Sequence, residues 1–341
     1  MSDSCQLPEF DQADAARLAR DLFALDGSLK LLHGERDLNY RISNDAGSFV
    51  FKIANAGEDR AMLDCQHRAF ERIEAAGVLP RVARARLSIN GHEIEVVEDN
   101  QGQQHYCRVL PFIEGRMWSA VGTPNPALLA DIGARLGGLD RALDGFSHPG
   151  LTRPLLWNME ITAVELERYT PLLASDAERA LVAQFEAGYR ERVLPLAGQL
   201  RRGVIHNDAN RENVVVDAAG EKVISIIDFG DMIETWLVLE PAIAATYAML
   251  DQDDPLDLGA ALIGGYHRAM PLRDEEIGIL FDLIGMRLSM SICLCAYQQR
   301  LQPDNEYLSI DVASSRNLLE RLQPLDPADV SEMLRAACAV D

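Results

Sequence analysis

The stretch GVIHNDANRENVVVD, residues 203–217, decides the fold of this 341-residue chain. It places a histidine, two aspartates, three asparagines and an arginine next to the apolar runs at 204–205 and 214–216. So polar a segment is unsuited to a hydrophobic core, because buried polar groups need hydrogen-bond partners. We therefore predict two short strands, with a functional loop between them.

The polar residues of this loop follow the pattern H-x-D-x-x-x-x-N, formed by His206, Asp208 and Asn213. Fifteen residues later, Asp228 ends an apolar run and begins Asp-Phe-Gly-Asp. Phosphoryl transfer needs a carboxylate that orients the attacking hydroxyl and oxygen ligands for Mg²⁺. Asp208 suits the first task, and Asn213 with Asp228 suits the second.

The same chemistry needs a cation that holds nucleotide phosphates, and Lys52 is the candidate. It lies in the apolar run SFVFKIA at 48–54. The chain has 32 basic residues, of which only Lys30, Lys52 and Lys222 are lysine. A lysine retained in such a chain indicates a position that needs a compact point charge. The alternative is a lysine whose stem lies along an edge strand while its charge reaches water.

Several short runs in the first 110 residues alternate between apolar and polar side chains, as β-strands do. Asn90-Gly91 separates two of these runs and is a strong hairpin signal. Apolar residues recur at helical spacing over 58–76. The expected strands are 37–43, 48–54, 86–89, 93–97 and 105–110. They predict a five-stranded antiparallel sheet that carries one helix.

The segment PFIEG at 111–115 interrupts this pattern, and the chain after it is mainly helical in character. Helices are expected from about 126, within 158–200 and from 240 onward, with a strand pair at 203–217 and 222–231. We therefore predict an α+β fold with two lobes. A nucleotide-binding β lobe would occupy 1–110, a hinge 111–115, and a helical catalytic and substrate lobe 116–341.

The composition narrows the range of binding partners that the protein could have. A formal net charge of −21 disfavours nucleic acid, since phosphate binding needs a basic surface. No apolar run is seen to approach the roughly 18–20 residues that span a bilayer, and the first residues are acidic where a signal peptide would be basic. We therefore expect a cytoplasmic protein without a membrane partner. The six cysteines show no metal-binding spacing, and the oligomeric state stays open.

Six stretches carry a resemblance to a known family. They are GERDLNYRI (34–42), GSFVFKIANAGE (47–58), CRVLPFIEG (107–115), HNDANRENVVV (206–216), IIDFGDM (226–232) and DNEYL (304–308). In this order, from about residue 31 to 307, they resemble the aminoglycoside phosphotransferase/choline kinase-like family. The hydroxylysine-kinase-like branch and the kinase-like domain fused to some class III aminotransferases are especially similar.

The resemblance implies a protein-kinase-like bilobal fold, with Mg²⁺ and with ATP or GTP as the phosphoryl donor. It makes Asp208 the catalytic base, Asn213 and Asp228 the Mg²⁺ ligands, and Lys52 the phosphate-holding lysine. Other nucleotide-binding positions follow from the same resemblance. They are Pro111 and Ile113 in the hinge, and Asp37 and Asn39 in GERDLNY, which stands in place of a glycine-rich loop.

Two positions depart from the family pattern. Asn207 replaces a glycine, and asparagine tolerates unusual backbone angles better than most residues. Gln66 stands where a helix glutamate would pair with Lys52, and a glutamine can accept a hydrogen bond from the lysine but brings no charge. We interpret Gln66 as a mark of the subfamily and include it among the nucleotide-binding residues.

Acceptors in this family are small hydroxyl compounds, often amines. Asp231 is a candidate anchor for an ammonium group, with helix capping as the alternative. Trp157 is a candidate wall of the acceptor pocket, with plain packing as the alternative. Asn305 and Tyr307 could close the pocket. We expect a hydroxylated amine or amino acid that resembles hydroxylysine, homoserine or an amino alcohol.

Three other functions remain to be weighed. A nucleotide-binding regulatory module without turnover is suggested by Gln66 and Asn207, but Lys52, Asp208, Asn213 and Asp228 argue against it. A protein kinase is disfavoured because GxGxxG and an A-P-E segment are missing. Aminoglycoside modification stays open, although nothing in the sequence is specific to it.

Overall fold

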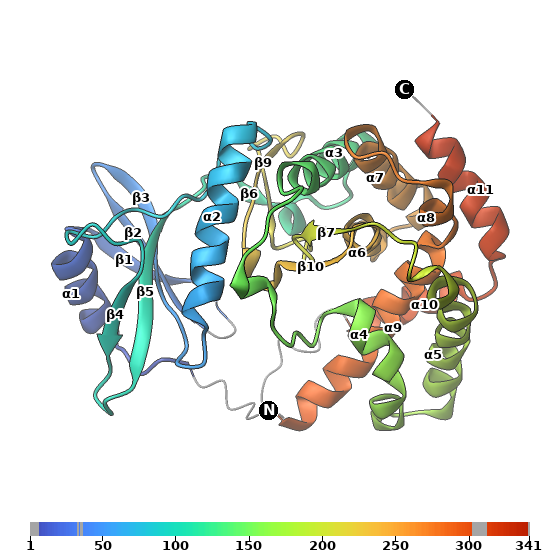
Figure 1. The fold of residues 1–341 in the computed structure, drawn as a ribbon, viewed down its shortest axis with the longest axis horizontal. Coiled ribbons are helices and arrows are strands. Elements are labelled where there is room, and N and C mark those ends of the chain that lie inside the picture. Colours follow the sequence, from blue (N-terminus) through green and yellow to red (C-terminus); the bar gives the residue numbers. More distant parts are fainter. Residues whose placement is uncertain (1–6, 33, 35–36, 302–311, 340–341) are drawn as a thin grey trace. The chain divides into compact units, whose positions relative to one another are not determined.

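The computed structural model describes residues 7–32, 34, 37–301 and 312–339. Asn305 and Tyr307, expected near the acceptor, lie outside these residues. The chain forms two compact units (Figure 1). The N-terminal unit comprises Met1–Glu114 and Ser147–Thr152, and the C-terminal unit comprises Gly115–Phe146 and Arg153–Asp341. A short segment after the helix α3 (Pro126–Ala142) thus belongs to the N-terminal unit, which a linear division of the sequence does not anticipate.

The N-terminal unit is built on a five-stranded antiparallel sheet in the order β1-β2-β3-β5-β4. Its strands are β1 (Ser28–Leu32), β2 (Leu38–Asn44), β3 (Gly47–Ile53), β4 (Glu95–Glu98) and β5 (Gln104–Pro111). Two helices accompany it, α1 (Gln12–Phe23) and α2 (Arg60–Ala76). The number of strands, their antiparallel pairing and the helix after β3 confirm the prediction.

Alternation along the strands gives the sheet two different faces. Phe51 and Ile53 of β3 are fully buried in a core that includes Phe23 of α1. Lys52, between them, points to the opposite face because successive strand side chains alternate. Arg108 of β5 is paired with Lys52 and bonds to side chains of α2. The helix α2 therefore covers the polar face, where Lys52 lies.

Two expectations for this unit were wrong. Residues 86–89 do not form a strand and contribute only an isolated bridge from Arg86 to Val109. The Ser88 hydroxyl instead accepts hydrogen bonds from the backbone amides of Asn90 and His92, which stabilise a local turn. The fifth strand is β1, whose largely exposed residues lack a strong alternating pattern. The helix α1 was also missed, so the sheet carries two helices.

The C-terminal unit is mainly helical. Its α-helices are α3 (Pro126–Ala142), α4 (Met159–Thr162), α5 (Asp176–Gly188), α6 (Leu239–Met249), α7 (Pro255–Ala269), α8 (Asp274–Gly278), α9 (Leu280–Leu301), α10 (Val312–Leu322) and α11 (Pro327–Cys338). Its strands are β6 (Arg116–Met117), β7 (Arg202–Ile205), β8 (Val214–Val216), β9 (Val223–Ile226) and β10 (Ile233–Trp236). Short 3₁₀ turns, among them η7 (Phe229–Asp231), connect these elements.

The predicted pairing of β8 with β9 is confirmed. The strand β7 pairs with β10, a strand that we did not predict. Residues 233–236 therefore form a strand, and the helical pattern begins only at Leu239. The region 158–200 is also less regular than predicted, because 3₁₀ turns and a π-helical turn at Tyr189–Val193 interrupt its helices.

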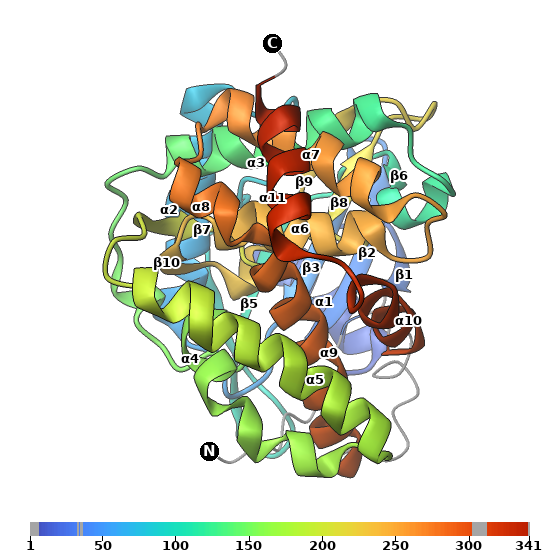
Figure 2. The same ribbon diagram turned by 90° about the vertical axis from the view of Figure 1, so that its right-hand side faces the viewer.

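The helix α9 is long and apolar enough to cross a bilayer by length and composition alone, contrary to our reading of the sequence. Its most apolar 18-residue window has a mean hydropathy of 1.5 and is 83% buried inside the protein. Figure 2 shows it among the other helices, and it packs against α5, α6, α10 and α11. A buried core helix passes the same test, so α9 is weak evidence for a membrane segment.

Candidate active site

The polar loop begins at the end of β7, where His206 acts as a structural pivot. Its side chain is 1% exposed. Nε2 donates to the carbonyl of Ile227, at 2.9 Å, while Nδ1 accepts from the amide of Asp208, at 3.3 Å. The ring also makes an edge-to-face contact with Phe229 at 4.7 Å. Burial lowers the pKa of His206. The neutral ring therefore ties the loop to the segment after β9.

The next residue, Asn207, has a φ of +67° and is completely buried. A positive φ disfavours most side chains, and asparagine tolerates it better than most. Asn207 thus adopts an unusual backbone angle of the kind that we expected asparagine to tolerate. The backbone N–H of Asn207 donates to Oε2 of Glu240, a residue of α6, at 3.1 Å. Burial raises the pKa of Glu240 to about 7.

Asp208 lies at the centre of a small amide network. Its Oδ2 accepts from Asn210 Nδ2 at 3.0 Å and from Asn213 Nδ2 at 2.9 Å. Asn213 Nδ2 also donates to the Asp208 carbonyl at 2.9 Å. Because both acceptors are oxygens, the amide nitrogen of Asn213 faces Asp208 and its oxygen points elsewhere. The carboxylate is thus oriented by two neutral donors.

The charge of Asp208 is controlled by its neighbours. Desolvation and the carboxylate of Asp231 raise the pKa of Asp208 to about 8, and Arg287 opposes this shift. Arg287 Nη2 lies 3.7 Å from Asp208 Oδ1. A carboxyl group whose pKa lies near neutrality, beside hydrogen-bond donors, is typical of a general base.

Asp228 follows β9 and has a φ of +58°. Its side chain is exposed, and Oδ1 accepts from the amide of Gly230 at 3.2 Å. The chain just before it is bound to the polar loop, because the amide of Ile227 donates to the Asn213 carbonyl at 2.9 Å. A non-glycine residue at positive φ is strained, and such strain is often kept at functional sites.

Asn213 and Asp228 carry oxygen groups that could hold a divalent cation. The Asn213 amide oxygen and the Asp228 carboxylate are the oxygen ligands that Mg²⁺ prefers, and Mg²⁺ usually takes only one or two protein carboxylates. Among the described residues, no group of three or more His, Cys, Asp or Glu could hold a metal by itself. One amide and one carboxylate are few protein ligands, and Mg²⁺ held in this way usually also binds waters and substrate phosphates.

The N-terminal unit presents Lys52 in a row of polar residues that crosses three strands. Asn39 of β2 is paired with Lys52 of β3, which is paired with Arg108 of β5. Lys52 is partly exposed, and the described residues of this unit give its ammonium no hydrogen bond or ion pair. An ammonium that these residues leave unpaired remains able to bind an anion.

Gln66 of α2 does not make the expected hydrogen bond with Lys52. Its Oε1 accepts instead from Arg108 Nη2 at 2.8 Å, and both residues are 4% exposed. Arg108 Nη1 also lies 3.3 Å from Nε2 of His67. The longer guanidinium of Arg108 thus occupies the position that we had given to the lysine.

The remaining nucleotide-binding candidates lie at the ends of β2 and β5. Asp37 Oδ1 accepts from the backbone and side-chain amides of Asn55, which holds the chain before β2 to the end of β3. Pro111 has no N–H group and cannot donate to a nucleotide base. Ile113 follows Phe112, which is fixed by Arg41: the guanidinium lies 3.9 Å from the Phe112 ring centroid.

On the acceptor side, the Asp231 carboxylate ends the turn η7 and is partly exposed. It makes no hydrogen bond or ion pair with another described residue, and the strand β10 follows it, so the capping alternative has no support. Trp157 is partly buried, with Arg287 4.6 Å from its ring centroid. The sequence analysis missed Arg287, although an isolated arginine within GMRLSMSICLC was a detectable signal.

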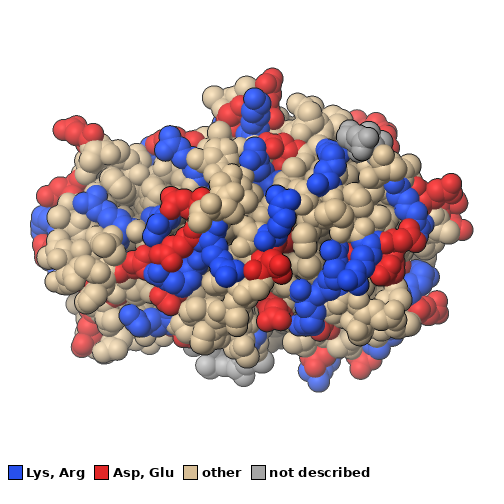
Figure 3. Space-filling model, turned by 45° about the horizontal axis from the view of Figure 1, so that its top comes forward, with Lys and Arg blue, Asp and Glu red and all other residues tan. Residues whose placement is uncertain are grey.

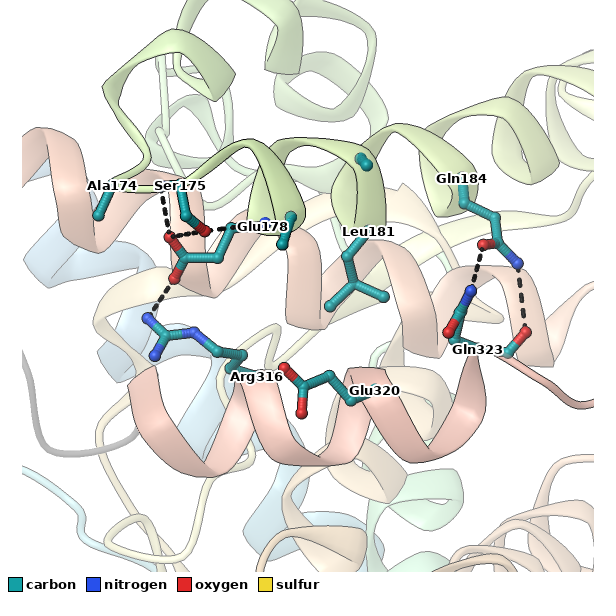
Figure 4. A pocket seen from close by; sticks show the side chains of 10 residues that line it. Ala174, Ser175, Glu178, Leu181, Gln184, Arg316, Glu320 and Gln323 are labelled. Carbon is teal, nitrogen blue, oxygen red and sulfur yellow. Dashed lines mark hydrogen bonds and ion pairs between the residues drawn. The ribbon is translucent and has the colours of Figure 1, made fainter.

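A groove of about 590 Å³ lies elsewhere in the C-terminal unit, between α5 and α10 (Figure 4). Arg316 pairs with Glu178 there, and Gln184 with Gln323. None of the predicted site residues lines it. On the face shown in Figure 3, acidic and basic side chains are intermixed, so the net charge of −21 does not form one acidic patch there.

The chain matches the phosphotransferase enzyme family over residues 28–276. It is 28% identical to hydroxylysine kinase of Mus musculus, over 96% of this chain and 93% of that protein. Homoserine kinase of Methylobacillus flagellatus is 29% identical over 78% of both chains. The chain therefore belongs to the phosphotransferase enzyme family and is a kinase, a phosphotransferase with an alcohol group as acceptor.

Solved structures agree on the fold. A microcompartment-associated aminopropanol kinase superposes with a TM-score of 0.73 at 14% identity, over 97% of this chain and 99% of that chain. An amicoumacin kinase gives 0.70 at 18% identity, over 94% and 97%. The predicted α+β kinase-like fold, with a small β unit and a larger helical unit, is thereby confirmed.

Proposed function

We propose that this protein is a Mg²⁺-dependent small-molecule kinase that transfers the γ-phosphoryl group of ATP or GTP to the hydroxyl of a small amine or amino acid. The observation that carries the proposal is the loop around Asp208. A carboxylate is held there in one orientation by the side-chain amides of Asn210 and Asn213. Asp228 lies just after β9, the strand that pairs with β8 at the end of this loop.

Asp208 orients the acceptor hydroxyl and takes its proton as the oxygen bonds to the γ-phosphorus. The bond from that phosphorus to the bridging oxygen breaks, and the nucleoside diphosphate leaves with this oxygen. Asn210 and Asn213 hold the carboxylate in one orientation, which favours catalysis because a fixed geometry lowers the barrier. Asn213 and Asp228 would hold Mg²⁺, which when bound neutralises charge on the transferring phosphates. Lys52 binds the phosphates from the N-terminal unit as a point charge.

The acceptor class is supported by two observations. Hydroxylysine kinases and homoserine kinases are among the relatives, and both names specify a hydroxyl on an amino acid. Asp231 offers a partly exposed carboxylate, without a described partner, that could hold the ammonium group of such a compound.

An acceptor screen tests the proposal. Nucleoside diphosphate release would be measured with ATP and with GTP against hydroxylysine, homoserine, amino alcohols, sugars and nucleosides, with and without Mg²⁺. We expect Mg²⁺-dependent release with a hydroxylated amine or amino acid. Faster turnover of uncharged sugars or nucleosides would refute the acceptor class, whereas no release with any acceptor would refute the kinase proposal.

Asp208→Asn provides the matched variant. It preserves the shape of the side chain but removes the base, so kcat should fall by roughly 10²- to 10⁴-fold. Nucleotide binding, measured by calorimetry, should stay close to that of the parent. Undiminished turnover in a folded variant would remove Asp208 from the mechanism.

A further inference from the structure

Arg287 is a buried cation beside the proposed base. It lies in the middle of α9, with a side chain that is 2% exposed. Nη2 donates to the Tyr247 hydroxyl at 3.0 Å and lies 3.7 Å from Asp208 Oδ1. The guanidinium is 4.6 Å from the ring centroid of Trp157 and 5.7 Å from that of Tyr247. Two aromatic rings and the base thus surround this one charge.

The hydrogen-bonding capacity of Arg287 is only partly used. Its Nε and Nη1 are buried, and neither has a partner within the described residues. Buried donors nearly always have a partner, because leaving one unpaired costs free energy. A guanidinium also presents its N–H groups as forks that match a carboxylate, formed by Nε with Nη2 or by Nη1 with Nη2. The free donors therefore indicate a missing anionic acceptor.

The carboxylate of Asp231 provides a negative charge near Asp208 and Arg287. Asp231 is partly exposed and, within the described part of the chain, makes no hydrogen bond or ion pair. Its field reaches both Asp208 and Arg287. The base is therefore flanked by an unpaired carboxylate and by a cation with unused donors. A ligand that carries both an ammonium and a carboxylate complements this pair.

We propose that Arg287 binds the carboxylate of the acceptor, so that the enzyme selects hydroxy amino acids over the corresponding amino alcohols. The inference rests on the proposed function and specifies the acceptor of that same site. The carboxylate binds one of the free groups, Nε or Nη1, together with the second N–H of Nη2, and the ammonium binds Asp231. Because Arg287 is buried against Trp157, the indole has to shift when the carboxylate binds.

A simpler role would be that Arg287 only positions Asp208. Loss of the arginine would then lower turnover by the same factor for every acceptor. The anchor role predicts a loss that is larger when the acceptor carries a carboxylate. Two acceptors that differ only in this group separate the two roles.

Homoserine and 3-aminopropan-1-ol form such a pair, and 5-hydroxylysine and 1,5-diaminopentan-2-ol form a second. The readout is the ratio of kcat/KM between the members of each pair. Arg287→Lys keeps the charge but loses the fork, and Arg287→Gln removes the charge. We expect the parent to prefer the amino acid of at least one pair. Both variants should lower that ratio by about 10- to 100-fold, as expected for a lost charge-assisted hydrogen bond.

Arg192→Lys is the control. Arg192, in the turn Tyr189–Val193, pairs with Asp282 of α9 at 2.5 Å. It makes no hydrogen bond or ion pair with the described residues of the loop 206–213, so the acceptor ratio of the variant should equal that of the parent. An equal loss for both members of a pair in the Arg287 variants would overturn the anchor role. So would a parent enzyme that does not discriminate within either pair.

Binding without nucleotide separates this inference from the kinase proposal. The chain has three tryptophans, of which Trp118 and Trp236 are only 2% and 3% exposed, so Trp157 should dominate a ligand-induced change in fluorescence. Homoserine or hydroxylysine should change the emission of the parent but not of Arg287→Gln, and the matched amino alcohol should have little effect. Carboxylate-dependent binding without turnover would support the anchor and refute the kinase proposal. Turnover without carboxylate dependence would do the reverse, and the absence of both would overturn both.

Discussion

Gln66 hydrogen-bonds to Arg108, and a double-mutant cycle measures this pairing directly. Gln66→Ala removes the acceptor and Arg108→Met removes the donor while keeping most of the apolar stem. The bond is 2.8 Å long, and both side chains are 4% exposed. A hydrogen bond to a charged group contributes about 1.5–3 kcal/mol. The two substitutions together should therefore cost about 1.5–3 kcal/mol less than the sum of the single losses.

The free energy of unfolding of the parent, the single variants and the double variant would be measured by urea denaturation. The control is a second cycle with Gln66→Ala and Lys52→Met, since Lys52 makes no described hydrogen bond with Gln66. Independent sites add to within about 0.5 kcal/mol, so this cycle should show no larger coupling. Additive losses for Gln66 and Arg108, or a strong coupling between Gln66 and Lys52, would refute the assignment.

Three further predictions address the metal, a helix crossing and acidity. Asp228→Ala should abolish Mg²⁺-dependent nucleotide binding in calorimetry, while Asn213→Ala weakens it less because the lost ligand is neutral; unchanged binding in both would misplace the metal site. Gly265→Ala should lower the melting temperature strongly, because the new Cβ would lie 2.0 Å from the carbonyl oxygen of Ala130, where α7 crosses α3. Gly198→Ala is the control, since the space around Gly198 is open. Equal melting temperatures for the two variants would contradict the close packing. Burial and the neighbouring arginines lower the pKa of His67 from 6.5 to about 3. As the pH falls below 6.5, His67 therefore takes up a proton in the unfolded chain but not in the folded protein. The free energy of unfolding falls as a result. Between pH 7.5 and 5 this loss is about 2 kcal/mol, and His67→Asn should flatten that part of the stability curve in urea denaturation.

Much of the site could be predicted because its signals are local in the chain. The apolar runs beside Asp208, Asn213 and Asp228 are short and are bounded by polar residues, which predicts strands and loops without knowledge of the fold. The positive φ of Asn207 was also foreseeable, since the residue type itself tolerates it. Likewise Lys52 is conspicuous because its neighbours are apolar.

What the sequence determined by itself was the order of the two units, the β8–β9 pair and the residues that carry the proposed chemistry. Tertiary structure alone decided the partners of those residues. Arg108 reaches Gln66 across 42 positions in the chain, and Arg287 reaches Tyr247 across 40. Neither contact leaves a periodic trace in the sequence, because a buried polar side chain is satisfied by whichever partner the packing brings near it. The edge strand β1 was missed for a related reason: its exposed side chains need no apolar alternation, and its pairing with β2 provides its order.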